Sequence, residues 1–172
     1  MPDVTLQATV PLPPEDAFDI FVQQMDIWWP RRGVFPYSFA PVGTRPLHIR
    51  FEPQLGGRYY ETFLDETEYE IGRITLYQPP ERLAYTWQDP AWQSETRIAL
   101  AFSAEENGAR VVYEQDGFAQ AGAPDLAAYY QIGCRQTLSA YVAHCQALYE
   151  LGHLSQQASS SYASRPPTRS MI

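Results

Sequence analysis

The chain has 172 residues, of which 45% are apolar and 14% aromatic, and its formal net charge is -8. This length suits one domain with a sizeable core. The negative charge argues against nucleic-acid binding, because phosphate contacts depend on clustered positive charge. All 12 basic residues are arginines, which excludes Schiff-base chemistry on a lysine.

The first ten residues, MPDVTLQATV, lack the basic stretch and long apolar run of a signal peptide. No segment approaches the roughly 20 apolar residues that a membrane span requires. We therefore expect a cytoplasmic protein without a membrane span.

The N-terminal part predicts a strand, a helix and an irregular loop. Residues 4–10 alternate as a strand. A helix then begins at Pro14, where proline suits the first turn, and apolar residues recur at helical spacing until Pro30 ends it. The segment from Pro30 to Pro46 mixes prolines with aromatic residues, so we expect no regular structure there. It is either an apolar loop tucked over the core or a lid over a ligand.

The central part of the chain predicts an antiparallel meander of strands. Compact turn signals separate the strands, among them Gly56-Gly57, Pro79-Pro80 and Asn107-Gly108. Gly72 lies inside a strand and indicates either a bulge or a close approach by a helix. The predicted strands are 47–51, 58–64, 69–77, 82–88, 95–103 and 110–116.

The last predicted element is a long amphipathic helix from Pro124 to Gly152, since glycine is a good residue to close a helix. Beyond it, the serine-rich segment 155–172 predicts a disordered tail and leaves residues 1–154 as the folded domain. The apolar face of the helix advances by threes and fours. Its members are Leu126, Tyr130, Cys134, Leu138, Tyr141, Cys145 and Leu148.

One early helix, a meander and a long C-terminal helix predict an α+β protein of the helix-grip layout. In this layout a curved antiparallel sheet of six to seven strands wraps around the C-terminal helix. Several local motifs agree with it, in a consistent order along the chain. They are Trp28-Trp29, Phe51-Glu52-Pro53-Gln54-Leu55-Gly56-Gly57, Gly72, Pro79-Pro80-Glu81-Arg82-Leu83 and Thr86-Trp87.

Together these motifs resemble bacterial proteins similar to the C-terminal domain of the heat-shock-protein-90 ATPase activator, within the START-like (SRPBCC) superfamily. The resemblance covers about residues 4 to 151. One departure concerns the final helix, which usually carries a Gly-Trp pair in this family. Here Gly133 is followed by Cys134, a change that enlarges or re-lines any inherited cavity.

The sequence supplies little for catalysis or metal binding. There is no Gly-x-Ser-x-Gly elbow, phosphate loop or dinucleotide fingerprint, and the three histidines lack the spacing of metal ligands. Cys134 and Cys145 lie about 16 Å apart on one helix, which rules out a disulfide between them. They are either small buried apolar groups or reactive thiols. We expect no catalytic residue, cofactor or metal.

The candidate site is a cavity between the C-terminal helix and the sheet, lined by aromatic bodies with a few polar tips. Glu61 and Arg73 fall on strand faces that point either into this cavity or to solvent, because strand register is not fixed by the sequence. A buried charge there would need a partner or a ligand charge. The candidate ligand-binding residues are Trp28, Trp29, Tyr59, Glu61, Arg73, Trp87, Tyr130, Cys134 and Tyr141.

The leading functional prediction is a non-catalytic binding protein for a hydrophobic or aromatic small molecule. A second hypothesis, implied by the family resemblance, is a chaperone cofactor that acts through a protein partner. A third is an enzyme of the cyclase or hydrolase kind found elsewhere in the superfamily, with Glu61 as acid or base. A homodimer formed through a sheet edge or a helix is also expected.

Overall fold

The computed structural model describes residues 1–31 and 37–163, with side chains up to residue 152. The strands that the sequence predicts are all present, with ends that differ by no more than two residues. In chain order the elements are β1 (Val4–Val10), α1 (Pro14–Gln23), α2 (Met25–Trp28), β2 (Pro46–Phe51), β3 (Arg58–Phe63), β4 (Glu68–Gln78), β5 (Arg82–Trp87), β6 (Thr96–Glu105), β7 (Gly108–Asp116), the short 3-10 helix η1 (Pro124–Leu126) and α3 (Ala127–Ala163).

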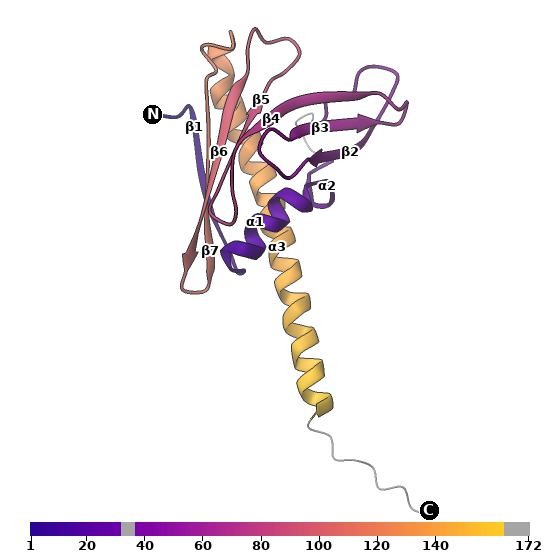
Figure 1. The fold of residues 1–172 in the computed structure, drawn as a ribbon, viewed down its shortest axis with the longest axis vertical. Helices are drawn as coiled ribbons and strands as arrows, with labels where there is room; N and C mark the ends of the chain where they lie inside the picture. Colours follow the sequence, from indigo (N-terminus) through magenta and orange to yellow (C-terminus); the bar gives the residue numbers. More distant parts are fainter. Residues whose placement is uncertain (32–36, 164–172) are drawn as a thin grey trace, which may run out of the picture.

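The seven strands form one antiparallel sheet in the order β1-β7-β6-β5-β4-β3-β2. The sheet curls, and Figure 1 shows β2, β3 and β4 turned at a wide angle to β1, β6 and β7, with α1 and α3 packed alongside. This is the helix-grip α+β architecture that the sequence predicts. Alternate residues of β6 are buried, as a sheet with one covered face requires.

Gly72 on β4 is required by a close approach, although a strand makes it and not a helix. A Cβ atom at this position would lie 1.9 Å from the carbonyl oxygen of Thr86 on β5. The β3–β4 register also shifts between Tyr59 and Tyr60, which is a bulge beside this glycine. The expected bulge is therefore found, and the expected helix contact is wrong.

Helix α1 starts at Pro14 and buries one face of aromatic and aliphatic side chains against the sheet. Phe18 and Phe21 both contact the ring of Phe102 on β6, with centroid distances of 5.2 and 6.2 Å. Each fully buried phenylalanine stabilises the fold by about 1.5–3 kcal/mol. The sequence predicts one helix up to Pro30, but the helix breaks at Gln24, whose φ is -115°, and α2 follows as a separate turn.

Helix α3 packs against the rest of the protein through its N-terminal half. Leu138, Tyr141 and Cys145 are buried, as the predicted apolar face requires, whereas Leu126 is 37% exposed. The predicted end at Gly152 is wrong, because the helix continues to Ala163 and projects beyond the sheet (Figure 1). Residues 164–172 of the expected tail lie outside the described residues. None of the helices in the described part of the chain is long and apolar enough to span a membrane.

Candidate ligand-binding cavity

A cavity of about 270 Å³ lies beneath the N-terminal half of α3. It is bounded by β5, β6 and β7 on the sheet, by α1 and α2, and by the loop around Ser38. This volume is close to the lower limit of small-molecule sites, which begin near 300 Å³. Eleven of the 20 lining residues are aromatic: Phe21, Trp28, Trp29, Tyr37, Phe39, Tyr85, Trp87, Trp92, Tyr113, Tyr129 and Tyr130.

Tryptophan and phenylalanine rings form one continuous wall of this cavity. Trp29 lies 6.0 Å from the ring of Trp28 and 6.3 Å from that of Trp87, and Phe39 lies 5.3 Å from Trp87. The indole N–H of Trp28 donates to the carbonyl of Ile20 (3.1 Å), and that of Trp29 donates to the carbonyl of Tyr37 (2.8 Å). These bonds fix the rings so that their faces border the cavity.

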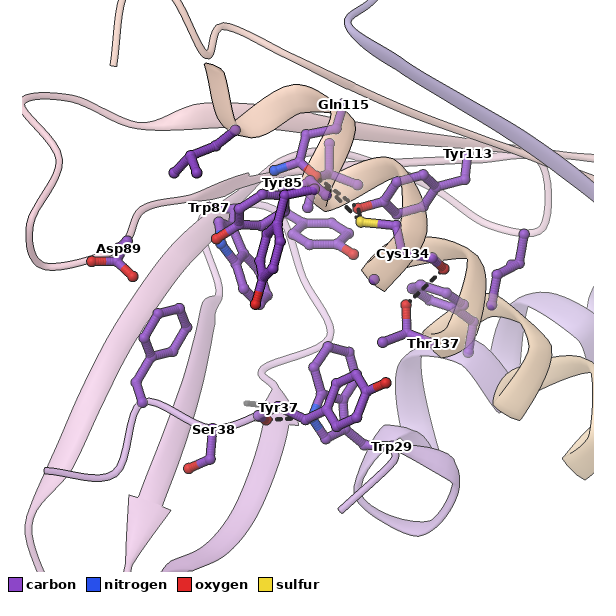
Figure 2. A pocket seen from close by; sticks show the side chains of 18 of the residues that line it. Trp29, Tyr37, Ser38, Tyr85, Trp87, Asp89, Tyr113, Gln115, Cys134 and Thr137 are labelled. Carbon is purple, nitrogen blue, oxygen red and sulfur yellow. Dashed lines mark hydrogen bonds between the residues drawn. The ribbon is translucent and has the colours of Figure 1, made fainter. Parts of the chain in front are cut away.

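A short hydrogen-bond network forms the wall between α3 and the sheet (Figure 2). The hydroxyl of Tyr113 lies 3.3 Å from the sulfur of Cys134 and donates to Gln115 Oε1 at 3.2 Å. Gln115 in turn donates to Thr96 Oγ1 at 3.0 Å. Burial raises the pKa of Cys134 to about 11, with the Tyr113 hydrogen bond opposing the rise. Cys134 is therefore a neutral thiol at physiological pH, and a weak nucleophile.

Trp87 brings an unsatisfied donor to the edge of the cavity. Its Nε1 is buried and has no hydrogen-bond partner among the described residues. Tyr130 lies close by, and burial raises its pKa to about 12, whereas the neighbouring indole N–H of Trp87 opposes that rise. The two groups form no hydrogen bond of normal geometry, so the Trp87 N–H is buried without an acceptor among the described residues. Leaving such a donor unpaired costs about 1–3 kcal/mol.

The loop that carries Tyr37, Ser38 and Phe39 is fastened across one side of the cavity. The Ser38 hydroxyl and the Phe39 amide both donate to the carboxylate of Glu61, at 2.5 and 2.7 Å. The Tyr37 hydroxyl donates to Gln136 on α3. The loop thereby bridges β3 and α3. It is part of the cavity wall, which favours a covering role over simple packing.

A family described as "Activator of Hsp90 ATPase homolog 1-like protein" matches residues 11–144, which is more than half of the chain. The chain belongs to this family. The resemblance drawn from Trp28-Trp29, Gly56-Gly57 and Pro79-Pro80 is thereby confirmed. Among curated proteins, none matches the chain.

Several solved structures share the fold of this Hsp90-activator-homologue chain. CV1439 from Chromobacterium violaceum is 23% identical over 83% of this chain and 96% of its own, with a TM-score of 0.58. CalU16 from Micromonospora echinospora is 14% identical over 93% of this chain and 85% of its own, also with a TM-score of 0.58. Txn09, titled an anthrahydroquino-gamma-pyrone synthase complexed with SUM, is 27% identical over 83% and 99%, with a TM-score of 0.54.

The structure brings five of the predicted site residues together at the cavity: Trp28, Trp29, Trp87, Tyr130 and Cys134. Tyr59 and Tyr141 are fully buried beside it but do not line it. Tyr59 stacks on Phe51 at 4.4 Å, and the Tyr141 hydroxyl donates to the carbonyl of Ala17 at 2.6 Å. Both tyrosines support the walls from behind.

Glu61 and Arg73 are not cavity residues in this Hsp90-activator homologue. The Arg73 side chain is 55% exposed and pairs with Glu70 at 2.7 Å, so its expected place in the cavity is wrong. The β3–β4 register shift between Glu70 and Gly72 contributes, since a bulge re-aims the side chains that follow it. Glu61 points inward, but its two oxygens hold the loop.

Sequence reasoning missed Asp89, Trp92 and Gln115, which all line the cavity. Asp89 and Trp92 lie in the turn after β5, where proline and aspartate signal a turn but give no direction to the side chains. Gln115 lies on the inward face of β7, and its position in the alternation of that strand is the signal that could have found it.

Proposed function

We propose that the protein is a non-catalytic, cytoplasmic binding protein for a small, largely aromatic molecule, which it holds in the cavity beneath α3. One observation carries this proposal, namely an open cavity of about 270 Å³ with eleven aromatic lining residues. Protein interiors are normally packed without large voids, so a space of this size bordered by rings indicates a ligand site.

The polar groups of the cavity support the same proposal. Ser38, Gln115 and Thr137 line the cavity beside the rings and supply the few polar groups that a small-molecule site needs. Txn09 provides independent support, because this relative is 27% identical and is described as an anthrahydroquino-gamma-pyrone synthase. We infer that the ligand of the present chain also has an aromatic ring system.

Binding without chemistry is proposed because the candidate acid–base residue is occupied elsewhere. Both oxygens of Glu61 accept hydrogen bonds from the loop at Ser38 and Phe39, and the residue does not line the cavity. Cys134 does line the cavity, but burial raises its pKa to about 11 and keeps it protonated. Neither group is poised to attack or deprotonate a bound molecule.

The experiment uses N-phenyl-1-naphthylamine, a neutral dye that becomes fluorescent in apolar sites. Thr137 on α3 lines the cavity, and its hydroxyl bonds only to the carbonyl of Cys134 in its own helix. Thr137→Phe places a ring inside the cavity, and we expect at least a tenfold loss of affinity for the dye, or about 1.4 kcal/mol.

Ser139→Phe is the matched control. Ser139 is exposed on the same helix, and its hydroxyl bonds in the same manner to the carbonyl of Arg135. This variant should bind the dye within about twofold of the unaltered protein. Absence of dye binding, or equal effects of the two substitutions, would overturn the proposal.

A chaperone-cofactor role is the second candidate, and the family name favours it. The surface offers exposed apolar side chains on α3, including Ile132 (55% exposed) and Leu151 (63%). Purified Hsp90 provides the test. Stimulation of its ATPase that Ile132→Asp abolishes would support this candidate, and an unchanged rate with no complex in gel filtration would remove it.

A further inference from the structure

The described residues that line the cavity include one carboxylate and no basic group. Among the residues that line it in the described part of the chain, Asp89 is the only aspartate or glutamate, and no arginine or histidine is present. The remaining polar groups are hydroxyls, one thiol, one amide and the indole N–H groups. An anionic ligand would therefore enter a site that offers no opposite charge, at a considerable cost in desolvation.

Asp89 has no cationic partner in the part of the chain that the structure describes. It takes part in no ion pair among the described residues. Its Oδ1 accepts the amide of Ala91 at 2.8 Å, which holds the side chain in the turn after β5. Figure 2 shows the carboxylate at the side of the cavity away from Cys134, beyond the indole of Trp87.

Aromatic residues line the cavity together with Asp89. Phe39 lies 5.3 Å from the ring of Trp87 and 5.0 Å from that of Tyr69. Trp92 lies 5.5 Å from the ring of Tyr130. The Trp92 amide donates to the Asp89 carbonyl at 2.9 Å, and the Tyr69 hydroxyl donates to the carbonyl of the preceding residue, Gln88, so these rings are tied to the turn that carries the carboxylate.

Ring faces and a lone carboxylate together suit a cation. A quaternary or protonated amine is attracted to an aromatic face within about 6 Å of the ring centre, and tryptophan gives the strongest attraction. An alkylated ammonium group is also weakly hydrated compared with a carboxylate, so its transfer into an apolar cavity costs less.

We infer that the cavity selects aromatic ligands that carry a positively charged amine, with the ring system under α3 and the ammonium group between Asp89 and the rings of Trp87 and Trp92. This inference rests on the proposed function and adds a charge class to it. Neutral aromatic molecules are accepted more weakly, and anions are rejected.

Three naphthalenes of nearly identical shape provide the test. They carry at position 2 a trimethylammonium group, a tert-butyl group or a sulfonate group, and so differ mainly in charge. Calorimetric titration of the unaltered protein should give the order cation, neutral, anion, with about tenfold between the first two and at least tenfold again to the sulfonate. Added salt should narrow the gap, because it screens partly exposed charges.

Asp89→Asn keeps the shape of the side chain and the acceptor for Ala91. It should bring the affinity for the ammonium compound to within about twofold of that for the tert-butyl compound. Asp116→Asn, at an exposed position at the end of β7, makes the same change in net charge and should leave the order unaltered. Thermal unfolding of each variant confirms that it is folded.

The possible outcomes distinguish a failure of the charge preference from a failure of ligand binding itself. Tert-butyl binding equal to or tighter than ammonium binding, or an equal effect of Asp89→Asn on all three ligands, would overturn the inference alone. Failure of the dye and of all three naphthalenes to bind would overturn the proposed function, and the inference with it.

Discussion

The tryptophan indoles that line the cavity differ in whether their N–H groups have hydrogen-bond partners. The Trp28 and Trp29 indoles donate to backbone carbonyls, whereas the Trp87 indole has no partner among the described residues. Tyr59 also has a buried, unpaired hydroxyl, but it lies behind the wall where a ligand does not reach. Trp87 is therefore the cavity-lining residue with an unmet hydrogen bond in the described part of the chain.

Trp87→Phe tests that hydrogen bond at the scale of one residue. Phenylalanine removes the unpaired N–H but has a smaller ring, so the relief of the unmet hydrogen bond offsets part of the packing loss and the free protein should lose less than about 2 kcal/mol. Chemical denaturation measures this difference. A loss of more than about 2 kcal/mol would show that Trp87 already has a partner in the free protein.

Glu61 gives the protein a pH-dependent stability. Burial raises its pKa above the ordinary value of 4.5, although the Ser38 and Phe39 hydrogen bonds oppose the rise. Folding therefore favours the protonated carboxyl. Its contribution to stability is complete below pH 4.5 and is lost as the pH rises through the raised value in the folded state.

Glu61→Gln removes this titration and keeps a side chain of similar shape. Relative to the unaltered protein, the variant should gain stability as the pH is raised from about 4 to about 8, because only the carboxyl has to ionise. Urea denaturation across this range measures the difference. A stability difference between the two proteins that stays constant with pH would contradict the raised pKa of Glu61.

At the scale of elements, close backbone contacts and one helix-to-helix bond hold the cavity open. The β4 backbone meets β5 at Gly72, and the Tyr141 hydroxyl joins α3 to the carbonyl of Ala17 on α1. The loop bonds to Glu61 and Gln136 add a third support. Because these contacts come from different parts of the sequence, the cavity depends on the assembled fold.

Gly72→Ala should destabilise the protein by about 3 kcal/mol, because its Cβ would lie 1.9 Å from the Thr86 carbonyl oxygen and the two strands would have to separate. Gly152→Ala is the control. It lies in α3 with open space around it, and alanine should stabilise the helix by about 0.5–1 kcal/mol. Similar effects at both positions, measured by thermal unfolding, would refute the close strand contact.

Tyr141→Phe should cost about 1–3 kcal/mol, because it leaves the buried carbonyl of Ala17 without its 2.6 Å partner. Tyr77→Phe is the comparison. Tyr77 is half-buried, and its ring contacts the ring of Phe18 in an edge-to-face arrangement with the centroids 5.7 Å apart. The Tyr77→Phe substitution should change the free energy of unfolding by no more than about 0.5 kcal/mol. Equal losses in denaturant titrations would mean that the Tyr141 bond contributes nothing specific.

At the scale of the whole molecule, the sequence predicts the fold far better than the site. Alternation and turn residues define the strands, since pairs such as Asn107-Gly108 act locally. Whether Glu61 or Arg73 faces inward depends on bulges, which shift register without a clear mark in the sequence. Asp89 lies in an irregular turn, where periodicity gives no direction at all.

The central prediction for this protein is that a small aromatic molecule occupies the cavity beneath α3. All four tryptophans of the chain line that cavity, so intrinsic fluorescence reports on it directly. Titration with N-phenyl-1-naphthylamine should quench tryptophan emission by energy transfer, saturate at one dye per chain, and lose affinity in Thr137→Phe but not in Ser139→Phe. Quenching that rises without saturation, or that is the same in both variants, would contradict the claim.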